Sequence, residues 1–197
     1  MKEVFERIIR DHLWMDVPCG TGSTLEYTQL LRDTLPDFLA RHNITSMLDA
    51  PCGDHSWMSL IDFPKNFKYI GGDIVEFMIQ ENRRLYPNRE FKVLDICQDP
   101  LPQVDLLFCR DCLFHLSYAD IKRAFDNIAN SNISWIMTTT YYTEHSRNVD
   151  IETGGFRPID LLSAPFDLPA PVDALPDGIP GKIVRKLALW PREVFAR

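Results

Sequence analysis

Acidic side chains follow four short apolar runs of this chain. The runs lead into Asp49-Ala50-Pro51-Cys52-Gly53-Asp54, Gly71-Gly72-Asp73, Asp95-Ile96 and Arg110-Asp111. When such runs are parallel strands of an α/β sheet, ligands bind just beyond their carboxyl ends. We therefore expect these carboxylates to converge on one binding crevice, although any single one would suit a solvated loop or a helix N-cap.

The spacing of Gly53 and Asp73 indicates a nucleoside. Asp73 lies 20 residues after Gly53, which is the length of one helix and a returning strand. Nucleoside-binding folds place at this position the acid that accepts hydrogen bonds from the ribose hydroxyls. The first loop has a single glycine, and Pro51 has no N–H, so the loop is a poor cradle for a pyrophosphate. These features favour a nucleoside with a cationic or zwitterionic tail over a dinucleotide.

Apolar runs that alternate with helical patterns predict parallel strands joined by helices. Five runs are expected strands and two weaker candidates follow: 46–50, 68–73, 90–94, 104–109, 133–140, 172–175 and 183–190. Ser23-x-x-Glu26 has the spacing of a capping box and predicts a helix that Pro36 interrupts. Ser117-x-x-Asp120 predicts the start of another helix.

Composition narrows the class of protein. Of the 197 residues, 45% are hydrophobic and the formal net charge is −7, which argues against disorder and against a nucleic-acid partner. No apolar run is long enough to span a bilayer. Residues 1–14 have the spacing of an amphipathic helix rather than of a signal peptide, and the five cysteines are an odd number. We therefore expect a cytoplasmic protein with reduced thiols.

The motifs around these acids resemble those of class I S-adenosylmethionine-dependent methyltransferases. The similar stretches are LDAPCGD (48–54), YIGGDIVEFM (69–78), VLDI (93–96) and VDLLFCRDCLFHLS (104–117), within about residues 44–141. The resemblance implies a Rossmann-like α/β fold with a seven-stranded, mostly parallel sheet in the order 3-2-1-4-5-7-6 and helices on both faces. It also implies a single domain over 1–197, with a helical cap or lid at 1–43, a cofactor-binding core at 44–141, and a Pro-rich substrate loop and final strands at 142–197.

A narrower resemblance connects the chain to small bacterial methyltransferases associated with surface-polysaccharide and modified-sugar genes. It rests on GTGST (20–24), DAPCGD (49–54), CRDCLFHL (109–116) and TGGFRPIDL (153–161). Two departures bear on the site. Pro51 and His55 stand in place of the first and last glycines of the first motif, and Phe156 stands in place of a tryptophan in the late motif.

The resemblance implies S-adenosylmethionine as cofactor and S-adenosylhomocysteine as product. By that comparison Asp49 faces the methionine amine, Asp73 holds the ribose and Asp95 lies beside the adenine. Arg110 neutralises either the cofactor carboxylate or the neighbouring Asp111. The full set of expected cofactor-binding residues is Asp49, Ala50, Pro51, Gly53, Asp73, Ile74, Asp95, Ile96 and Arg110.

Expected catalytic residues are His115, Asp111 and His145, because a hydroxyl acceptor needs a general base and histidine titrates nearest to neutral pH. Each histidine could instead cap or pack locally. Tyr141 and Arg157 are expected to contact the acceptor, with a surface salt bridge as the other interpretation of Arg157. Cys109-x-x-Cys112-x-x-His115 has the residue types of a metal site, but buried strand-end thiols are the favoured interpretation and no metal is expected.

The sequence therefore predicts methyl transfer to a hydroxyl or amine of a small polar acceptor, with a sugar or glycan-linked group as the leading candidate. Such an enzyme would act as a monomer or homodimer, with a small-molecule or glycan acceptor as its partner. Three alternatives stay open. One is a non-catalytic or partner-dependent protein with a methyltransferase fold, and another is a nucleotide-sugar or NAD-dependent enzyme. The third is a nucleic-acid methyltransferase, against which the acidic charge and the absence of an Asn-Pro-Pro-Tyr-type motif argue.

Overall fold

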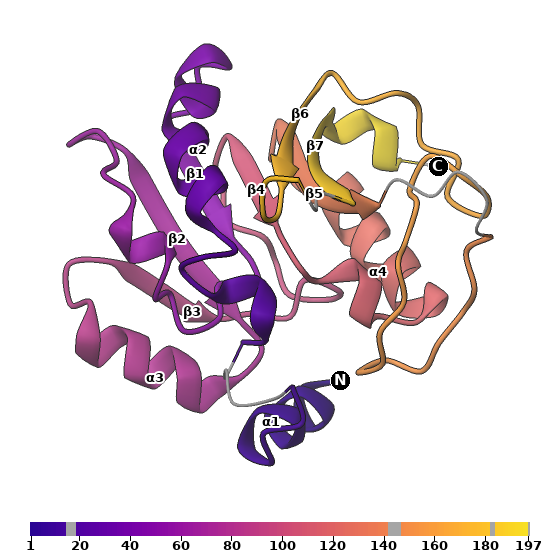
Figure 1. Cartoon of the computed structure of the whole chain (residues 1–197), viewed down its shortest axis with the longest axis horizontal. Coiled ribbons are helices and arrows are strands. Elements are labelled where there is room, and N and C mark those ends of the chain that lie inside the picture. The colour runs from indigo at the N-terminus through magenta and orange to yellow at the C-terminus, as the bar shows by residue number, and fades with distance from the viewer. Residues whose placement is uncertain (15–18, 142–146, 182–183, 197) are drawn as a thin grey trace.

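A single sheet of seven strands forms the centre of the protein. The computed structural model describes residues 1–14, 19–141, 147–181 and 184–196. The strands are β1 (Ser46–Asp49), β2 (Lys68–Asp73), β3 (Glu90–Val93), β4 (Leu106–Cys109), β5 (Trp135–Tyr141), β6 (Asp173–Asp177) and β7 (Arg185–Pro191). Their order is β3-β2-β1-β4-β5-β7-β6, which confirms the predicted topology (Figure 1). β1 to β5 are parallel, and β7 lies antiparallel between β5 and β6.

The central strands are apolar on both faces because helices cover both. Along β4 the side chains alternate, so that Leu106 and Phe108 belong to one hydrophobic core and Leu107 and Cys109 to the other. All four are buried. A strand with two covered faces appears in the sequence as a continuous apolar run, which is why the short runs were recognisable as strands.

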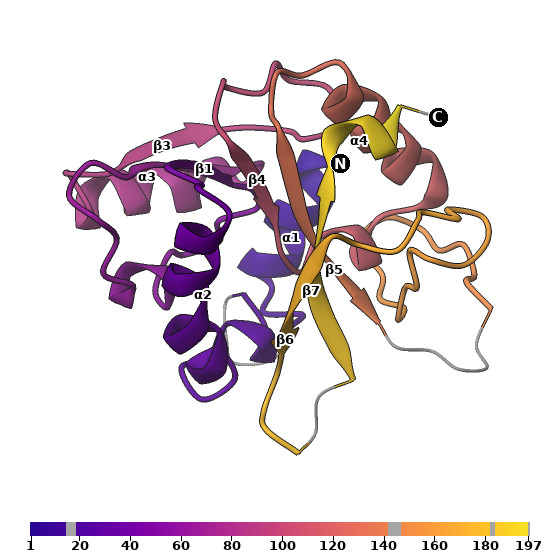
Figure 2. The same cartoon turned by 90° about the horizontal axis from the view of Figure 1, so that it is seen from above.

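The described residues include four α-helices beside the sheet: α1 (Lys2–Arg10), α2 (Gln29–Arg41), α3 (Glu76–Leu85) and α4 (Tyr118–Ala129). The buried apolar side chains of α2 and Ile79 of α3 join one core, whereas those of α4 and of the short helix Arg192–Phe195 join the other. Figure 2 shows α2 and α4 on opposite sides of β5 and β7. Within the described ranges, no helix combines the length and the apolar character needed to cross a membrane.

The start of α2 differs from the prediction. α2 begins at Gln29, and Ser23 lies in a short 3-10 turn, where its hydroxyl donates to the carbonyl of Gly20 (2.8 Å). Thr24 Oγ1 accepts from the Tyr27 amide (3.3 Å) in the turn before the helix, and Thr28 at the N-cap position makes no side-chain capping bond. The helix is also continuous through Pro36. Buried Leu35, Phe38 and Leu39 on either side of the proline pack it against the core and offset the lost hydrogen bond.

The start of α4 follows the prediction and also anchors the tail. Ser117 Oγ accepts from the Asp120 amide (3.2 Å), as an N-cap does. The Asp120 carboxylate does not return to the Ser117 amide, because it bonds Thr153 and Arg123 instead. The Ser117 amide donates to Thr153 Oγ1 (2.9 Å). The irregular tail is thereby tied to the helix that follows β4.

We predict that Gly71→Ala lowers the free energy of unfolding by about 1–3 kcal/mol, because the new methyl group would overpack the core. An added Cβ would lie 2.5 Å from Phe91 Cδ1 and 3.2 Å from Cys52 Sγ. Gly72→Ala on the same strand is the matched control, since its nearest neighbour would lie at 3.3 Å. Chemical denaturation measures both. Equal losses for the two variants would contradict the steric explanation.

Candidate functional site

A cavity opens at the carboxyl ends of the central strands and holds most of the predicted cofactor-binding residues. Its volume is about 980 Å³, including the open mouth. The predicted residues that line it are Asp49, Pro51, Gly53, Asp73, Ile74, Asp95, Ile96 and Arg110. Ala50 does not line it, because its side chain is fully buried in the core behind the loop. The topology therefore brings the exits of β1, β2, β3 and β4 together at one edge of the sheet.

Asp73 joins the exits of β1 and β2. Its carboxylate accepts from the Gly53 amide (3.0 Å) through Oδ2 and from the Val75 amide (2.9 Å) through Oδ1. Gly53 has a φ of 55°, a conformation that glycine adopts at little cost. Asn82 Nδ2 donates to the Gly53 carbonyl (2.7 Å) from α3. The glycine turn is thus held from both sides.

Two buried acids make this end of the cavity a site for positive charge. Burial raises the pKa of Asp49 to about 7, against the opposing effects of the Tyr69 hydrogen bond and of Arg110. Burial likewise raises the pKa of Asp73 to about 6, although backbone amides that donate to it act in the other direction. Both carboxylates are almost fully hidden from solvent. A cationic ligand group would stabilise their ionised forms.

A tight turn fixes Asp95 at the end of β3. Asp95 Oδ1 accepts from the Cys97 amide (2.9 Å), and the Asp95 amide donates to Asp99 Oδ2 (2.8 Å). Asn127 Nδ2 of α4 donates to the carbonyls of Ile96 and Asp99, both at 2.9 Å. The carboxylate and the apolar side chain of Ile96 consequently face the cavity on a rigid support.

The first residues of the chain form a wall of the cavity, although none of them was among the individually expected site residues. Met1, Phe5 and Ile9 on or beside α1 line the cavity together with Trp14. Phe5 meets the Trp14 ring edge to face, with centroids 6.1 Å apart. Further along, Cys19 Sγ accepts from the Asp54 amide (3.3 Å), so the N-terminal segment also packs on the first loop. The apolar stripe of the first fourteen residues was the available signal in the sequence.

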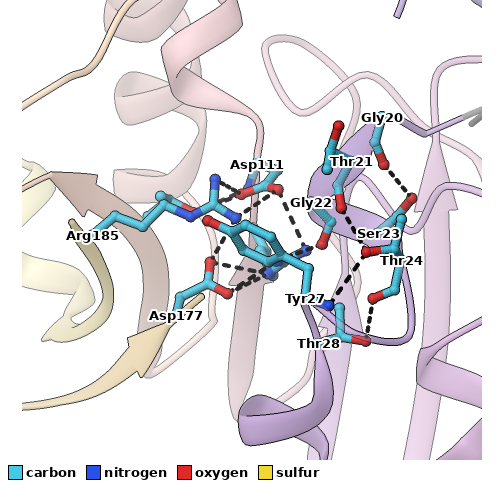
Figure 3. Close-up of polar contacts among 12 residues, drawn as sticks. Gly20, Thr21, Gly22, Ser23, Thr24, Tyr27, Thr28, Asp111, Asp177 and Arg185 are labelled. Atoms are coloured by element: carbon cyan, nitrogen blue, oxygen red, sulfur yellow. Dashed lines mark hydrogen bonds and ion pairs between the residues drawn. The ribbon is translucent and has the colours of Figure 1, made fainter. Parts of the chain in front are cut away.

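Two arginines and two aspartates form a buried ion cluster beside the cavity (Figure 3). Arg110 Nη2 lies 2.9 Å from Asp177 Oδ1, and Arg185 Nη1 lies 3.0 Å from Asp111 Oδ1. Arg185 Nη2 reaches Asp177 Oδ2 (3.1 Å), and Arg110 Nη1 reaches Asp111 Oδ2 (3.4 Å). The side chain of Asp177 is fully buried. Each positive charge is thereby compensated by two carboxylates.

The ion cluster also ties three distant segments together. Arg110 Nη2 donates to the carbonyl of Gly22 in the 3-10 turn (2.8 Å), and the Tyr27 ring lies 4.8 Å from the Arg185 guanidinium carbon. Asp111 has a φ of 54°, and its amide donates to Thr139 Oγ1 on β5 (3.1 Å). Arg110 thus forms ion pairs with Asp111 and Asp177. Asp111 was one of its two expected partners, whereas no motif indicated Asp177.

His115 lies in the cavity wall, and one of its ring nitrogens is engaged in a hydrogen bond. Its Nδ1 lies 2.6 Å from the carbonyl of Gly155, which can only accept, so Nδ1 carries a proton. Burial lowers the pKa of His115 below its ordinary value, although the bond to Gly155 opposes this. The neutral ring therefore has its lone pair at Nε2. The Trp14 ring stacks on the imidazole, with centroids 4.6 Å apart.

Tyr141 and Arg157 do not line this cavity. Tyr141 lies at the end of β5, where its hydroxyl accepts from Arg185 Nη1 (3.4 Å). Arg157 donates to the carbonyl of Leu113 (3.3 Å) and lies over the Tyr118 ring. Arg157 is therefore buried and not at the surface, and the contact of either residue with an acceptor stays a prediction. His145 falls outside the described residues.

Comparisons with solved structures identify the fold. The PH0226 protein of Pyrococcus horikoshii OT3 matches with a TM-score of 0.65 at 16% identity over 91% of this chain and 98% of that chain. A 1,6-didemethyltoxoflavin-N1-methyltransferase of Burkholderia thailandensis matches with 0.64 at 14% over 96% and 86%. An S-adenosylmethionine-dependent methyltransferase of Clostridium acetobutylicum ATCC 824 matches with 0.57 at 12% over 95% of both chains. The chain thus has the methyltransferase fold.

No protein-family model matches the sequence, and no curated protein matches it. The chemistry of this chain therefore has to be argued from the residues of its own cavity.

We predict that Asp177→Ala lowers the free energy of unfolding by about 3–5 kcal/mol, because Arg110 and Arg185 would stay buried with too little negative charge. Asp173→Ala on the same strand is the control. Asp173 pairs with Arg41 and His42 near the surface, and such pairs contribute about 1 kcal/mol or less. Urea denaturation compares the two variants. If both variants lost a similar free energy of unfolding, burial of the ion cluster would not be the reason for the loss.

Proposed function

We propose that this protein transfers the methyl group of S-adenosylmethionine to a hydroxyl or amine of a small polar acceptor. The observation that carries the proposal is the convergence of Asp49, Asp73 and Asp95 on one cavity at the strand exits. The fold is that of methyltransferases, and the Burkholderia thailandensis enzyme is described with S-adenosylhomocysteine bound.

The cavity residues fit this cofactor part by part. Both oxygens of Asp73 already accept one backbone amide, and each keeps a lone pair that can accept a ribose hydroxyl. Ile74 and Ile96 supply apolar surface for the adenine, beside the Asp95 carboxylate that would accept from its amino group. Asp49 would balance the positive charge of the methionine amine. This role would explain why a carboxylate lies at a position where burial raises its pKa.

A dinucleotide fits the same residues less well. Pro51 has no amide hydrogen to offer a pyrophosphate, and Gly53 is the only glycine of the first loop. Asp49 and Asp73 would add repulsion, because both are buried carboxylates of the cavity. An NAD-dependent or nucleotide-sugar reaction is therefore the weaker candidate.

When bound, the cofactor supplies an electrophilic methyl group on a positively charged sulfur. The chain must then hold the acceptor in line with it and take up a proton where the acceptor is a hydroxyl. His115 Nε2 suits that role, because the Nδ1 contact with Gly155 fixes the tautomer and the lowered pKa keeps the ring neutral. Among the expected catalytic residues, it is the one we propose as general base.

Asp111 has a different proposed role. Each of its oxygens already meets two donors, Oδ1 those of Arg185 and Thr139 and Oδ2 those of Arg110 and Arg185, so neither keeps a lone pair for a proton. Asp111 nevertheless lines the cavity. We propose that Asp111 has a structural role, in which its contacts with the arginines fix the cavity wall between His115 and the ion cluster. The N-terminal segment 1–43 would act as the cap, since Phe5, Ile9 and Trp14 already lie over the cavity.

A sugar hydroxyl of a bacterial surface glycan is our leading candidate for the acceptor. The proposal rests on the resemblance of the GTGST, DAPCGD, CRDCLFHL and TGGFRPIDL stretches to small methyltransferases of modified-sugar genes. Incubation with labelled cofactor and a panel of nucleotide sugars, glycans and amines, followed by mass detection of the product, tests this choice.

We predict that calorimetry detects micromolar binding of S-adenosylhomocysteine and none of NAD. Asp73→Asn should weaken S-adenosylhomocysteine binding by about 1–3 kcal/mol, because the ribose hydroxyls lose a charged acceptor. The exposed Asp62→Asn is the control and should bind as the wild type does. Tight binding of NAD, or an unchanged affinity in Asp73→Asn, would refute the assignment.

We predict that His115→Asn lowers kcat by about 10²–10⁴-fold for a hydroxyl acceptor found in the panel. Asparagine can keep the donor to Gly155 while it removes the Nε2 lone pair, so S-adenosylhomocysteine affinity should change less than about threefold. His42→Asn, which lies outside the cavity lining, serves as control. Wild-type kcat should be flat with pH near neutrality, because the lowered pKa of His115 leaves the base already deprotonated. Retained turnover in His115→Asn would assign the residue to packing alone.

A further inference from the structure

A row of three buried side chains leads from the cavity into the core. Tyr69 Oη donates to Asp49 Oδ2 at 2.6 Å, and His55 Nδ1 lies 3.0 Å from the same phenol oxygen. Asp49 lines the cavity, whereas Tyr69 and His55 do not. All three side chains are buried. Of these three residues, Asp49 is the one that has a role in the proposed function.

We propose that Tyr69 and His55 are positioning residues for Asp49, which hold its carboxylate ionised and oriented toward the cationic end of the bound ligand. The inference rests on the proposed function, because that function supplies the cationic group. Neither residue touches the ligand in this proposal. They act through hydrogen bonds that stabilise one charge state and one rotamer of the acid.

The direction of the hydrogen bonds follows from counting protons. A phenol has a single proton, and the short contact with Asp49 uses it when the acid is ionised. The phenol oxygen must then accept from His55, so Nδ1 carries the proton of the neutral ring. Burial lowers the pKa of His55 to about 4, which keeps the ring neutral at physiological pH. His55 Nε2 is buried and has no hydrogen-bond partner among the described residues.

Charged and titratable groups lie at both ends of this row, with aromatic rings around His55. Around Asp49 the charged and titratable neighbours are Arg110 and Asp73 at the strand exits, with the Cys52 thiol beside the loop. On the far side, Arg89 lies over the Tyr69 ring at 5.6 Å, and its charge also lowers the pKa of His55. The His55 ring otherwise meets aromatic rings, those of Tyr86 at 4.8 Å and Phe91 at 5.1 Å.

The backbone at His55 has a conformation that would favour the glycine that the related motif carries at this position. Its φ of 58° is left-handed, a conformation that glycine adopts freely and histidine adopts at a cost. A glycine would avoid this cost but would supply no donor to Tyr69. The structure therefore links the histidine in this position to the hydrogen bond that it makes with the phenol.

Tyr69→Phe is the decisive variant. Loss of the hydroxyl should raise the pKa of Asp49, so that a cation is bound well only at higher pH. Affinity for S-adenosylhomocysteine should fall by about tenfold near pH 6.5 and by less than about threefold near pH 8.5, as expected for a shift of about one pKa unit. Affinity for adenosine, which lacks the cationic tail, should change by less than about twofold at either pH.

Tyr86→Phe is the matched control, because it removes a phenol hydroxyl from the same aromatic group without touching Asp49. Calorimetry at the two pH values should give wild-type affinities for this variant. An equal loss in Tyr69→Phe at both pH values, or an equal loss for adenosine, would show a merely structural role and overturn the proposal.

Two substitutions test His55 without forcing the backbone. His55→Asn keeps a donor near the Nδ1 position, and both asparagine and glycine tolerate a positive φ. His55→Gly removes the donor and should shift the pH dependence in the same direction as Tyr69→Phe, whereas His55→Asn should shift it less. Coincident profiles for the two variants would remove His55 from the row.

A ligand-free measurement separates this inference from the proposed function. Carbon-13 NMR of the Asp49 carboxyl should find its pKa near the value of about 7 in the wild type and about one unit higher in Tyr69→Phe. If the wild type fails to bind S-adenosylhomocysteine, the proposed function is wrong, while the titration still tests the row. An unchanged Asp49 pKa in Tyr69→Phe would overturn the inference even where cofactor binding is established.

Discussion

The burial of carboxylates at the exits of parallel strands is the constraint on which this site depends. Parallel strands bring their carboxyl ends to one edge, so Asp49 and Asp73 meet there whatever the intervening sequence does. Burial makes ionisation of these acids costly, and the backbone amides of Gly53 and Val75 offset part of that cost at Asp73. The cationic end of the proposed cofactor would offset more of it. The cavity therefore favours a positively charged ligand group on electrostatic grounds.

In the ion cluster, unlike at Asp49 and Asp73, the buried charges are compensated within the protein. There two guanidinium groups and two carboxylates compensate one another, and Asp177 is completely buried between its arginines. Such a cluster contributes little to stability compared with an apolar core, but it is directional. It sets the position of Asp111 and holds the 3-10 turn through Gly22 (Figure 3). One side of the cavity is thus rigid and neutral, while the other is acidic.

His115 is contacted both by the N-terminal segment and by the C-terminal tail. Trp14 from the N-terminal segment stacks on His115, and Gly155 from the tail fixes the tautomer of the same ring. A histidine that would otherwise be partly protonated near neutral pH is held neutral by this enclosure. The same contacts therefore enclose this side of the cavity and fix the tautomer of the histidine that we propose as the base.

The apolar runs of the sequence predict the strands and the acids at their exits, because parallel strands covered on both faces are continuously apolar. The order of the strands followed from the resemblance of the motifs to methyltransferases and not from the runs. The start of α2 and the continuity through Pro36 were not predicted, because packing of Leu35 and Phe38 outweighs local signals there. Which side chains share the cavity depends on the tertiary structure. Arg157 and Tyr141 face elsewhere, and Tyr69 and His55 stand behind Asp49, because side-chain direction and long-range pairing depend on neighbours that no spacing rule specifies.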